Sequence, residues 1–480
     1  MRKLFALLVM MVFPTLLIAQ DKLAALNRPL VFRNVALIDM RSEKPHAGMS
    51  VLISGNRIAK IGRNIKIPKN AEFVDAGGKF LMPGLWDSYT YTLNAVKEGL
   101  PYFEMFVAHG VTGVRDSGTL KDLAEAERLQ NDMLSGRVLA PRLFYSGRSV
   151  NGADMSEQGL RNRPSLQSKN ADEAVRHVET LARGGVDYIS IGALLPPELV
   201  PSVVAAAQKR KLPVLSYVVY GYGRASDFGV NCIEHFADLD RSVSKNRDEY
   251  FEHYHTRRGS KMTADENYAF FKTLIDSRDQ TFYESTLQAL ADNKTCVATN
   301  FAGFGLARNT FDLTDLSRRR FKTKKQLEQL EAAIVEKERQ RRNNDMRASE
   351  ADTKRHLQGI YELHKARVPL LAGTQTSANR IASPGIWLHD ELYYFVQAGL
   401  SPFDALKTAT ANPAKLMRRE KDLGTIEKGK LADLILLDAN PLADISNTRK
   451  INAVVANGRY LSREVLDKML SDIEAKAKMQ

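Results

Sequence analysis

The fold is decided by one stretch, Leu81-Met82-Pro83-Gly84-Leu85-Trp86-Asp87-Ser88-Tyr89-Thr90-Tyr91-Thr92. An apolar run reaches a Pro-Gly pair and then continues as a predicted strand over residues 81–91. Successive side chains of a strand point to opposite faces, so Asp87, Tyr89 and Tyr91 share one face. The sequence therefore places a carboxylate and two phenols together toward the end of this strand.

The composition is that of an ordinary globular protein. The chain has 480 residues, of which 44% are hydrophobic and 26% charged, close to the usual proportions. Its length suggests about three domains, or fewer if an α/β barrel of roughly 250 residues is present. The net charge is +13, but Lys and Arg are spread along the chain and no nucleic-acid-binding motif accompanies them. A nucleic-acid function is therefore disfavoured.

The first 19 residues read as a secretory signal peptide. Arg2 and Lys3 precede an apolar run over residues 4–18, and Ala19 is a small residue at the expected cleavage point. A retained membrane anchor is disfavoured because Pro14 interrupts the run, which is shorter than the about 20 apolar residues that a span needs. We expect a periplasmic or secreted protein with no transmembrane span after removal of the signal.

The chain has only two cysteines, Cys232 and Cys296. Two cysteines cannot form a disulfide framework, although one bridge can form in an oxidising compartment. Both residues lie in apolar, strand-like runs, where a buried free thiol is the more common outcome. We therefore expect two free cysteines, with a single bridge as the less favoured alternative.

Short β signals open the mature chain, and strands then alternate with helices. The β signals lie at residues 30–40, 48–54, 57–61 and 72–74. From residue 81 onward, predicted strands alternate with predicted helices such as 120–135 and 171–183, the pattern of a parallel βα fold. The eight predicted strands are residues 81–91, 111–116, 142–147, 186–192, 212–218, 232–236, 295–301 and 369–374. Their number and order predict an α/β fold with a (β/α)₈ TIM-like barrel.

A long charged segment, residues 238–361, interrupts this alternation. It contains one predicted strand and is otherwise helical, with mixed charges over residues 318–347. We interpret it as an exposed helical insertion over the barrel mouth, where it could act as a lid. A partner-binding patch is the alternative, and the role of the insertion stays open.

Beyond the barrel, β signals return at residues 424–438 and 453–457. Together with residues 81–92, 397–402 and 409–417, they resemble the amidohydrolase superfamily, in the branch of imidazolonepropionase-like and prolidase-like enzymes. In that branch the first barrel strand reads Pro-Gly-Leu-x-Asp-x-His-x-His. The resemblance covers about residues 29–470. It implies a barrel over residues 81–417 beside a composite β-sandwich domain formed by residues 28–80 and 418–464.

The resemblance also implies a metal site, which this chain does not reproduce. Relatives hold one or two divalent cations through two histidines on strand one, a carboxylated lysine on strand four, histidines on strands five and six, and an aspartate on strand eight. A zinc-bound water then becomes the nucleophile, with a pKa near about 7. The corresponding residues here are Tyr89, Tyr91, Ser190, Tyr217, His235 and Gln375. Five of the six are replaced, and the remaining imidazole cannot hold zinc alone. We therefore predict no metal cofactor.

Other residues in family-like stretches have plainer interpretations. Asp87, Arg115 and Asp116 match family positions at strand ends and are interpreted as structural supports. His389 follows the last strand and is either a ligand contact or a packed histidine, with neither favoured.

Three functions remain open. The first is an exported pseudoenzyme that binds a small neutral polar molecule in a pocket formed by the six residues at the former ligand positions. The second is an active hydrolase acting on carbon–nitrogen bonds with a non-standard or metal-independent site that uses His235. The third is a protein-binding scaffold. No nucleic-acid partner is expected, an oligomer is possible, and the sequence does not identify the ligand.

Overall fold

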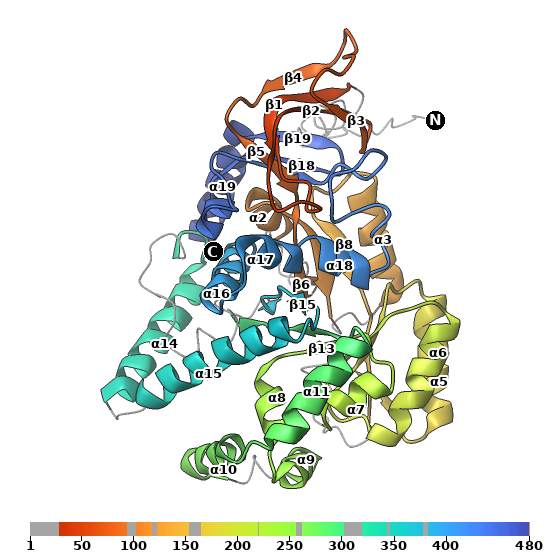
Figure 1. The fold of residues 1–480 in the computed structure, drawn as a ribbon, viewed down its shortest axis with the longest axis vertical. Coiled ribbons are helices and arrows are strands. Elements are labelled where there is room, and N and C mark those ends of the chain that lie inside the picture. Colours follow the sequence, from red (N-terminus) through yellow and green to blue (C-terminus); the bar gives the residue numbers. More distant parts are fainter. Residues whose placement is uncertain are drawn as a thin grey trace, which may run out of the picture.

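The structure is a computed structural model that describes residues 28–93, 102–117, 122–152, 165–218, 220–255, 262–301, 319–342, 346–377 and 383–479. The segment predicted as a signal peptide, residues 1–19, lies outside these ranges. Within them, no helix is long and apolar enough to cross a membrane. Figure 1 shows a β-rich unit at one end of the molecule and helices gathered around a central set of strands.

The central strands form the predicted barrel. In the described residues, its eight parallel strands are β6 (Leu85–Tyr91), β7 (Val111–Asp116), β8 (Arg142–Tyr145), β11 (Ile189–Ile191), β12 (Val214–Tyr217), β13 (Cys232–Glu234), β14 (Cys296–Ala298) and β15 (Leu370–Leu371). Two short strands outside this ring, β9 (Ser149–Gly152) and β10 (Ser165–Ser168), pair beside β11, and β16 (Thr376–Ser377) pairs with β6. The (β/α)₈ prediction is confirmed, whereas β9 and β10 were not predicted.

Backbone hydrogen bonds across two seams close the strands into a barrel. At the first seam, Asp187 N donates to Tyr145 O at 2.9 Å, which joins β8 to the segment entering β11. At the second, Ser88 N donates to Ala372 O at 2.9 Å and Gln375 N donates to Tyr89 O at 2.7 Å. The first and last strands are thereby joined, so the barrel is closed and has no free edge.

A buried aspartate strengthens each seam. Asp87 accepts hydrogen bonds from Thr374 Oγ1 at 2.5 Å and from Thr374 N at 3.0 Å. Asp187 accepts from Tyr145 N at 3.0 Å. Burial raises the pKa of Asp87 to about 7 and that of Asp187 to about 6, although these hydrogen bonds lower both values. The prediction that Asp87 is a structural support agrees with this geometry.

Helices cover the outside of the barrel. Helix α5 (Ala171–Arg183), predicted with the same bounds, begins at Asn170, whose side chain accepts from Glu173 N, and buries Ala174, Val178 and Leu181. The other outer helices are α2 (Tyr102–Ala108), α3 (Leu123–Leu134), α6 (Val200–Lys209), α7 (Tyr222–Asp227), α11 (Gln280–Asp292), α15 (Met346–Lys365), α16 (Ile386–Gln397), α17 (Pro402–Thr408) and α18 (Ala411–Leu416). Their apolar faces pack on the strands in one continuous core.

The two ends of the chain form the β-domain together. Its described strands are β1 (Leu30–Leu37), β2 (His46–Ser54), β3 (Arg57–Gly62), β4 (Glu72–Asp75), β5 (Phe80–Pro83), β17 (Leu434–Leu437), β18 (Ile451–Ala456) and β19 (Arg459–Ser462). They make one eight-stranded sheet in which β5 pairs antiparallel with β17. Apolar side chains from both ends enclose a shared core. The terminal helix α19 (Arg463–Met479), which was not predicted, contacts α2.

The predicted first strand, residues 81–91, is two strands. Residues up to Pro83 belong to β5 in the β-domain, and β6 starts at Leu85 in the barrel. The break falls at Gly84, where a Cβ atom would lie 2.1 Å from Thr112 Oγ1. Gly84 N donates to Asp433 O at 2.8 Å, so the connection between the two domains is fixed.

The charged insertion is helical, and part of it packs on the carboxyl end of the barrel. It contains α8 (Ala237–Ser242), α9 (Arg247–His255), α10 (Ala264–Asp276) and α14 (Lys324–Arg342); Figure 1 shows α14 and α15 projecting on one side. Asp240 accepts from Arg278 at 2.6 Å and from Arg355 of α15 at 2.8 Å. Phe236 and Phe301, which follow β13 and β14, pack against His356 of α15.

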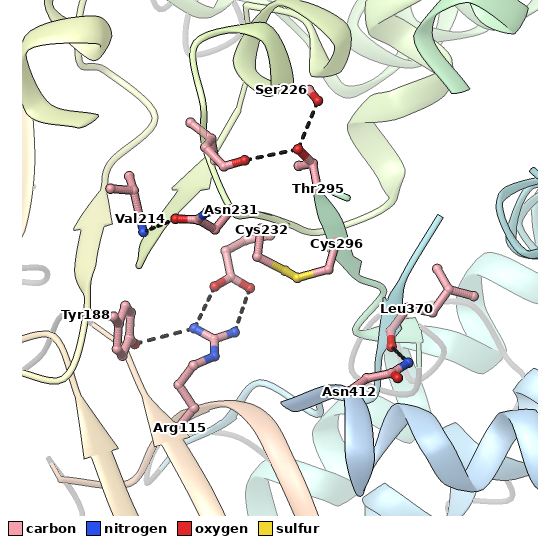
Figure 2. Close-up of a disulfide and its surroundings, with 12 residues drawn as sticks. Arg115, Tyr188, Val214, Ser226, Asn231, Cys232, Thr295, Cys296, Leu370 and Asn412 are labelled. Carbon is pink, nitrogen blue, oxygen red and sulfur yellow. Dashed lines mark hydrogen bonds and ion pairs between the residues drawn. A yellow bond between two sulfur atoms is a disulfide. The ribbon is translucent and has the colours of Figure 1, made fainter. Parts of the chain in front are cut away.

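The expectation of two free cysteines is wrong, because Cys232 and Cys296 form a disulfide. The two residues are direct partners in the register of β13 and β14, with Cα atoms 4.4 Å apart. The sequence placed both in strands but could not show that the strands are neighbours in this register. Figure 2 shows the bridge and, below it in this view, the Arg115 guanidinium with its partners.

The disulfide predicts a measurable contribution to stability. The bridge closes a loop with a sequence separation of 64 residues, and chain-entropy arguments give about 2–4 kcal/mol for such a cross-link. We expect Cys232→Ala with Cys296→Ala to lower the free energy of unfolding by this amount in chemical denaturation. Unfolded wild-type protein without reductant should show no thiol that reacts with a colorimetric thiol reagent; two reactive thiols per chain would contradict the bridge.

The raised pKa of Asp87 leads to the prediction that the stability of the protein depends on pH. Because its pKa is raised from 3.8 to about 7 by burial, ionisation destabilises the folded state as the pH rises through this window. The ionisation of Asp87 lowers the free energy of unfolding by on the order of 4 kcal/mol between pH 4 and 8. Asp87→Asn should show a flatter profile than wild type in denaturation at pH 4.5, 6.0 and 7.5. Parallel profiles would mean that Asp87 does not titrate in this range.

Candidate functional site

Two tyrosines at the end of β6 form the base of the candidate site. Tyr89 is 4% exposed and Tyr91 is half-buried. Their hydroxyl oxygens are 2.5 Å apart, and the rings meet edge to face with centroids 5.3 Å apart. Since the residues are two apart on one strand, they share a face, as the sequence indicated.

His235, directly after β13, joins this pair. Its Nε2 lies 3.3 Å from Tyr89 Oη and its Nδ1 lies 3.3 Å from Asn300 Nδ2. In one tautomer Nδ1 accepts from the Asn300 amide and Nε2–H faces Tyr89, and in the other Nε2 accepts from the Tyr89 hydroxyl. The backbone of His235 has a φ of +67°, and its carbonyl accepts from Tyr222 Oη at 2.5 Å. The imidazole is therefore held from both sides.

Tyr217 and Gln375 complete the cluster from neighbouring strands. Tyr217, the last residue of β12, lies edge to face with His235 at a centroid distance of 4.8 Å. Gln375 is bound through its backbone to Tyr89, and its buried Oε1 has no hydrogen-bond partner among the described residues. Ser190 lies on β11, next to β12, and hydrogen-bonds Ser149 Oγ at 2.9 Å. The structure thus joins five of the six predicted residues directly, and Ser190 sits one strand away.

A buried ion pair lies beneath these aromatic rings. Arg115 of β7 and Glu234 of β13 are joined at 2.7 and 3.1 Å, with side chains 1% and 5% exposed. The Arg115 guanidinium lies 5.5 Å from the centroid of the Tyr89 ring and donates to Tyr188 Oη at 3.4 Å. Although burial lowers it, the pKa of Arg115 lies above its ordinary value because of the Glu234 charge. The charges of Arg115 and Glu234 therefore offset each other below the cluster.

His389 lies apart from this cluster. On α16, its Nδ1 lies 2.9 Å from Thr448 Oγ1 and its Nε2 lies 3.0 Å from the backbone oxygen of His109. Burial lowers the pKa of His389 well below its ordinary value, so the ring is neutral. Of the two interpretations left open, the geometry favours the packed histidine, which joins α16 to the segment before β18.

The residues at the six expected ligand positions do not fit a divalent metal. Neutral phenols, a serine and an amide replace five ligands, and both nitrogens of the remaining imidazole face other side chains. Across the described ranges, no group of three or more His, Cys, Asp or Glu side chains is placed to hold a metal ion. Zinc sites use three or four such ligands.

Sequence reasoning missed two parts of the site. Asn300, which follows β14 with a φ of +50°, was not singled out although it contacts His235. Arg115 was interpreted as a structural support, but its pairing with Glu234, 119 residues away in sequence, was not predicted. Only the closed barrel brings these residues together. The one available signal was that each falls at the end of a predicted strand.

Comparison with known proteins places this geometry in a family. The profile of the amidohydrolase family matches residues 94–461. Over 87 residues, 18% of this chain, the sequence is 31% identical to an adenine deaminase of Mesorhizobium japonicum. The match spans only 14% of that relative's length, so its activity does not transfer.

Solved structures of low sequence identity share the fold. A bottromycin amidohydrolase superposes with a TM-score of 0.70 at 18% identity, over 98% of this chain and 95% of its own. A Xaa-Pro dipeptidase with bound methionine superposes with a TM-score of 0.63 at 20% identity, over 90% of this chain and 100% of its own. These likenesses agree with the barrel and its added β-domain. Because the family profile covers most of the sequence, the chain belongs to the amidohydrolase family.

Proposed function

We propose that this chain is a hydrolase-family protein that binds a small neutral polar molecule and does not use the metal-dependent hydrolysis of its relatives. The observation that carries the proposal is the engagement of both ring nitrogens of His235, by Tyr89 and Asn300. Members of the family typically use divalent metals. Here the one histidine at an expected ligand position is hydrogen-bonded to side chains instead, which supports a pseudoenzyme site.

The chemistry of the cluster favours a neutral ligand. Its hydroxyl, imidazole and amide groups bear no formal charge, and the ion pair beneath them is self-neutralised. The buried Oε1 of Gln375 lacks a partner among the described residues, and an unsatisfied buried acceptor costs about 1–3 kcal/mol. A ligand N–H or O–H group would satisfy it. A cyclic amide, a sugar or a capped peptide has this chemistry, whereas a free carboxylate does not.

One observation favours a second candidate function. The contacts His235–Tyr89–Tyr91 form a continuous hydrogen-bonded path from a buried imidazole to a half-buried phenol. Such a path could move a proton in a metal-independent hydrolysis of a carbon–nitrogen bond, with His235 as the general base. Turnover that persists in chelator and disappears in His235→Ala would support this candidate over the first.

We also propose that the protein is exported. The disulfide between β13 and β14 supports this, since such bridges persist in oxidising compartments. Finding the chain in the periplasmic or secreted fraction of the source cells would test it.

The first prediction from this function concerns metal content. Protein purified without added metal should carry well under one equivalent of zinc, manganese, iron or nickel by inductively coupled plasma mass spectrometry. The physical reason is the lack of three or more suitable ligands at one place. His235→Ala should not change the content. A stoichiometric metal that His235→Ala removes would overturn the pseudoenzyme proposal.

The second prediction concerns ligand binding. In a thermal-shift screen of cyclic amides, sugars and capped peptides, a true ligand at 100 times its Kd should add about 2.7 kcal/mol of stability. Tyr217→Phe and Gln375→Met should each weaken the hit by about 1–3 kcal/mol, because each leaves a ligand polar group unpaired at almost constant side-chain volume.

Tyr460→Phe is a matched control, because Tyr460 belongs to β19 in the β-domain. It should leave the affinity unchanged. A ligand whose affinity is unchanged in both site variants would bind elsewhere on the protein. A complete absence of hits would favour the interpretation that the phenols only fill the former metal cavity.

A further inference from the structure

A cavity of about 500 Å³ lies at the opposite end of the barrel from the tyrosine cluster. Its walls include Pro213, Asn231, Lys294 and Pro369, which precede β12, β13, β14 and β15 respectively. These are the amino-terminal ends of four adjacent strands. The proposed function does not use this cavity, and the family site lies at the other end of the strands.

The cavity is strongly basic. Its cationic lining residues are Lys294, Arg367, Lys407, Lys415 and Arg418. The lining holds one carboxylate, Asp404, which accepts a hydrogen bond from Lys407 Nζ at 3.1 Å. Among the described residues, the other four cations form no ion pair with an acidic side chain. The cavity thus carries an uncompensated positive charge.

Three of these cations occupy backbone positions that favour glycine. Lys294, Arg367 and Arg418 have φ values of +55°, +62° and +55° and follow the ends of α11, α15 and α18. The left-handed region is unfavourable for residues with a Cβ atom, and helices commonly end there with glycine. This chain does so after α3 and α5, at Gly136 and Gly185. Lys211, after α6, shares this conformation but does not line the cavity, so the conformation alone does not single out the lining residues.

Helix dipoles account for only part of this charge. Helices α11, α15, α17 and α18 end near the cavity, and each helix end carries about half a negative charge. Cations there stabilise the helix ends, and this is the plainest competing explanation. Four helix ends offset about two positive charges, fewer than the four unpaired cations of the lining. More cations therefore line the cavity than the helix ends offset, and all four of them are exposed.

The floor of the cavity is rigid and offers further polar groups. Cys296 of the disulfide lines it, with Asn231 and Asn412 beside it. Asn231 Oδ1 accepts from Val214 N at 2.8 Å, and Asn412 Nδ2 donates to Leu370 O at 2.9 Å. Figure 2 shows both amides next to the bridge, each tied to a strand. Their positions are thus fixed before any ligand arrives.

We propose that this basic cavity binds a compact, multiply charged phosphate group. The Arg367 guanidinium can bind phosphate oxygens bidentately, and Lys294 and Lys415 can add charge. Arg418 donates one N–H to Lys211 O at 2.8 Å and keeps its other donors for a ligand. The volume suits a small molecule with a phosphate or diphosphate group. The shared chemistry is the phosphate oxyanion, which a soluble phosphate ester or the headgroup of an anionic lipid can supply.

Inorganic pyrophosphate is the probe for a soluble source, and vesicles of phosphatidylglycerol are the probe for a lipid source. We expect saturable pyrophosphate binding by isothermal titration calorimetry with sodium chloride matched for ionic strength. In a flotation assay, binding to phosphatidylglycerol vesicles but not to phosphatidylcholine vesicles would assign the lipid source instead. Absence of both interactions would overturn the proposal.

Lys294→Asn with Arg367→Asn is the decisive variant, because asparagine tolerates the left-handed backbone and removes both charges. It should weaken binding of the effective probe at least tenfold, since charge-assisted hydrogen bonds are lost. Lys211→Asn is the matched control: Lys211 follows α6 with a φ of +58° and does not line the cavity. Its hydrogen bond from Arg418 uses the backbone oxygen, which the substitution keeps. It should change the affinity less than twofold.

Lys415→Gln, on the exposed side of α18, provides a second variant that leaves the left-handed positions untouched. It should weaken binding about threefold or more, even if the double variant fails to fold. Unchanged binding in Lys415→Gln and in a folded double variant would overturn the proposal. If Lys211→Asn lost as much affinity for the probe as the double variant, the effect would be one of general surface charge, and the proposal would be overturned too.

Discussion

Closure of the barrel between its first and last strands is the constraint on which the rest of the structure depends. The seam is short, because β15 contains only two residues. Backbone hydrogen bonds from Ser88 and Gln375 join the first strand to the segment that follows β15. Asp87 adds two hydrogen bonds from Thr374 to the same seam. The seam also sets the site, since it places Gln375 directly beside Tyr89. A protein that lost its metal ligands could still keep this seam, because none of its bonds requires the metal.

The ion pair Arg115–Glu234 is the second interaction that the site depends on. It crosses from β7 to β13 in the barrel interior, where removal of one partner leaves a buried charge that costs about 3–5 kcal/mol. The pair holds the Tyr89 ring above the guanidinium. Because Glu234 is already matched by Arg115, it offers no spare negative charge to a cation at the mouth. The charge of Glu234 is thus offset inside the barrel by Arg115.

The sequence predicted the architecture well and the contacts less well. The barrel followed from the alternation of strands and helices, which depends on local order, and the β-domain formed by both chain ends was implied by the family resemblance. The break at Gly84 was missed because one apolar run enters both domains without a change of pattern. The disulfide was missed because register between strands is a property of the whole barrel. Asn300 was missed for the same reason, since its role comes from a ring that lies 65 residues earlier in the chain.

Residues at both ends of the barrel adopt the left-handed backbone conformation. At the carboxyl end, His235, Asn300 and Gln375 have positive φ values of +67°, +50° and +57°. At the amino end, Lys294, Arg367 and Arg418 share this conformation. Each such residue costs about 1–2 kcal/mol relative to a relaxed backbone. Glycine would remove most of this cost if the positions served only to turn the chain. At the carboxyl end these residues belong to the imidazole cluster, and at the amino end they line the basic cavity, whereas Lys211 adopts the same conformation without lining it.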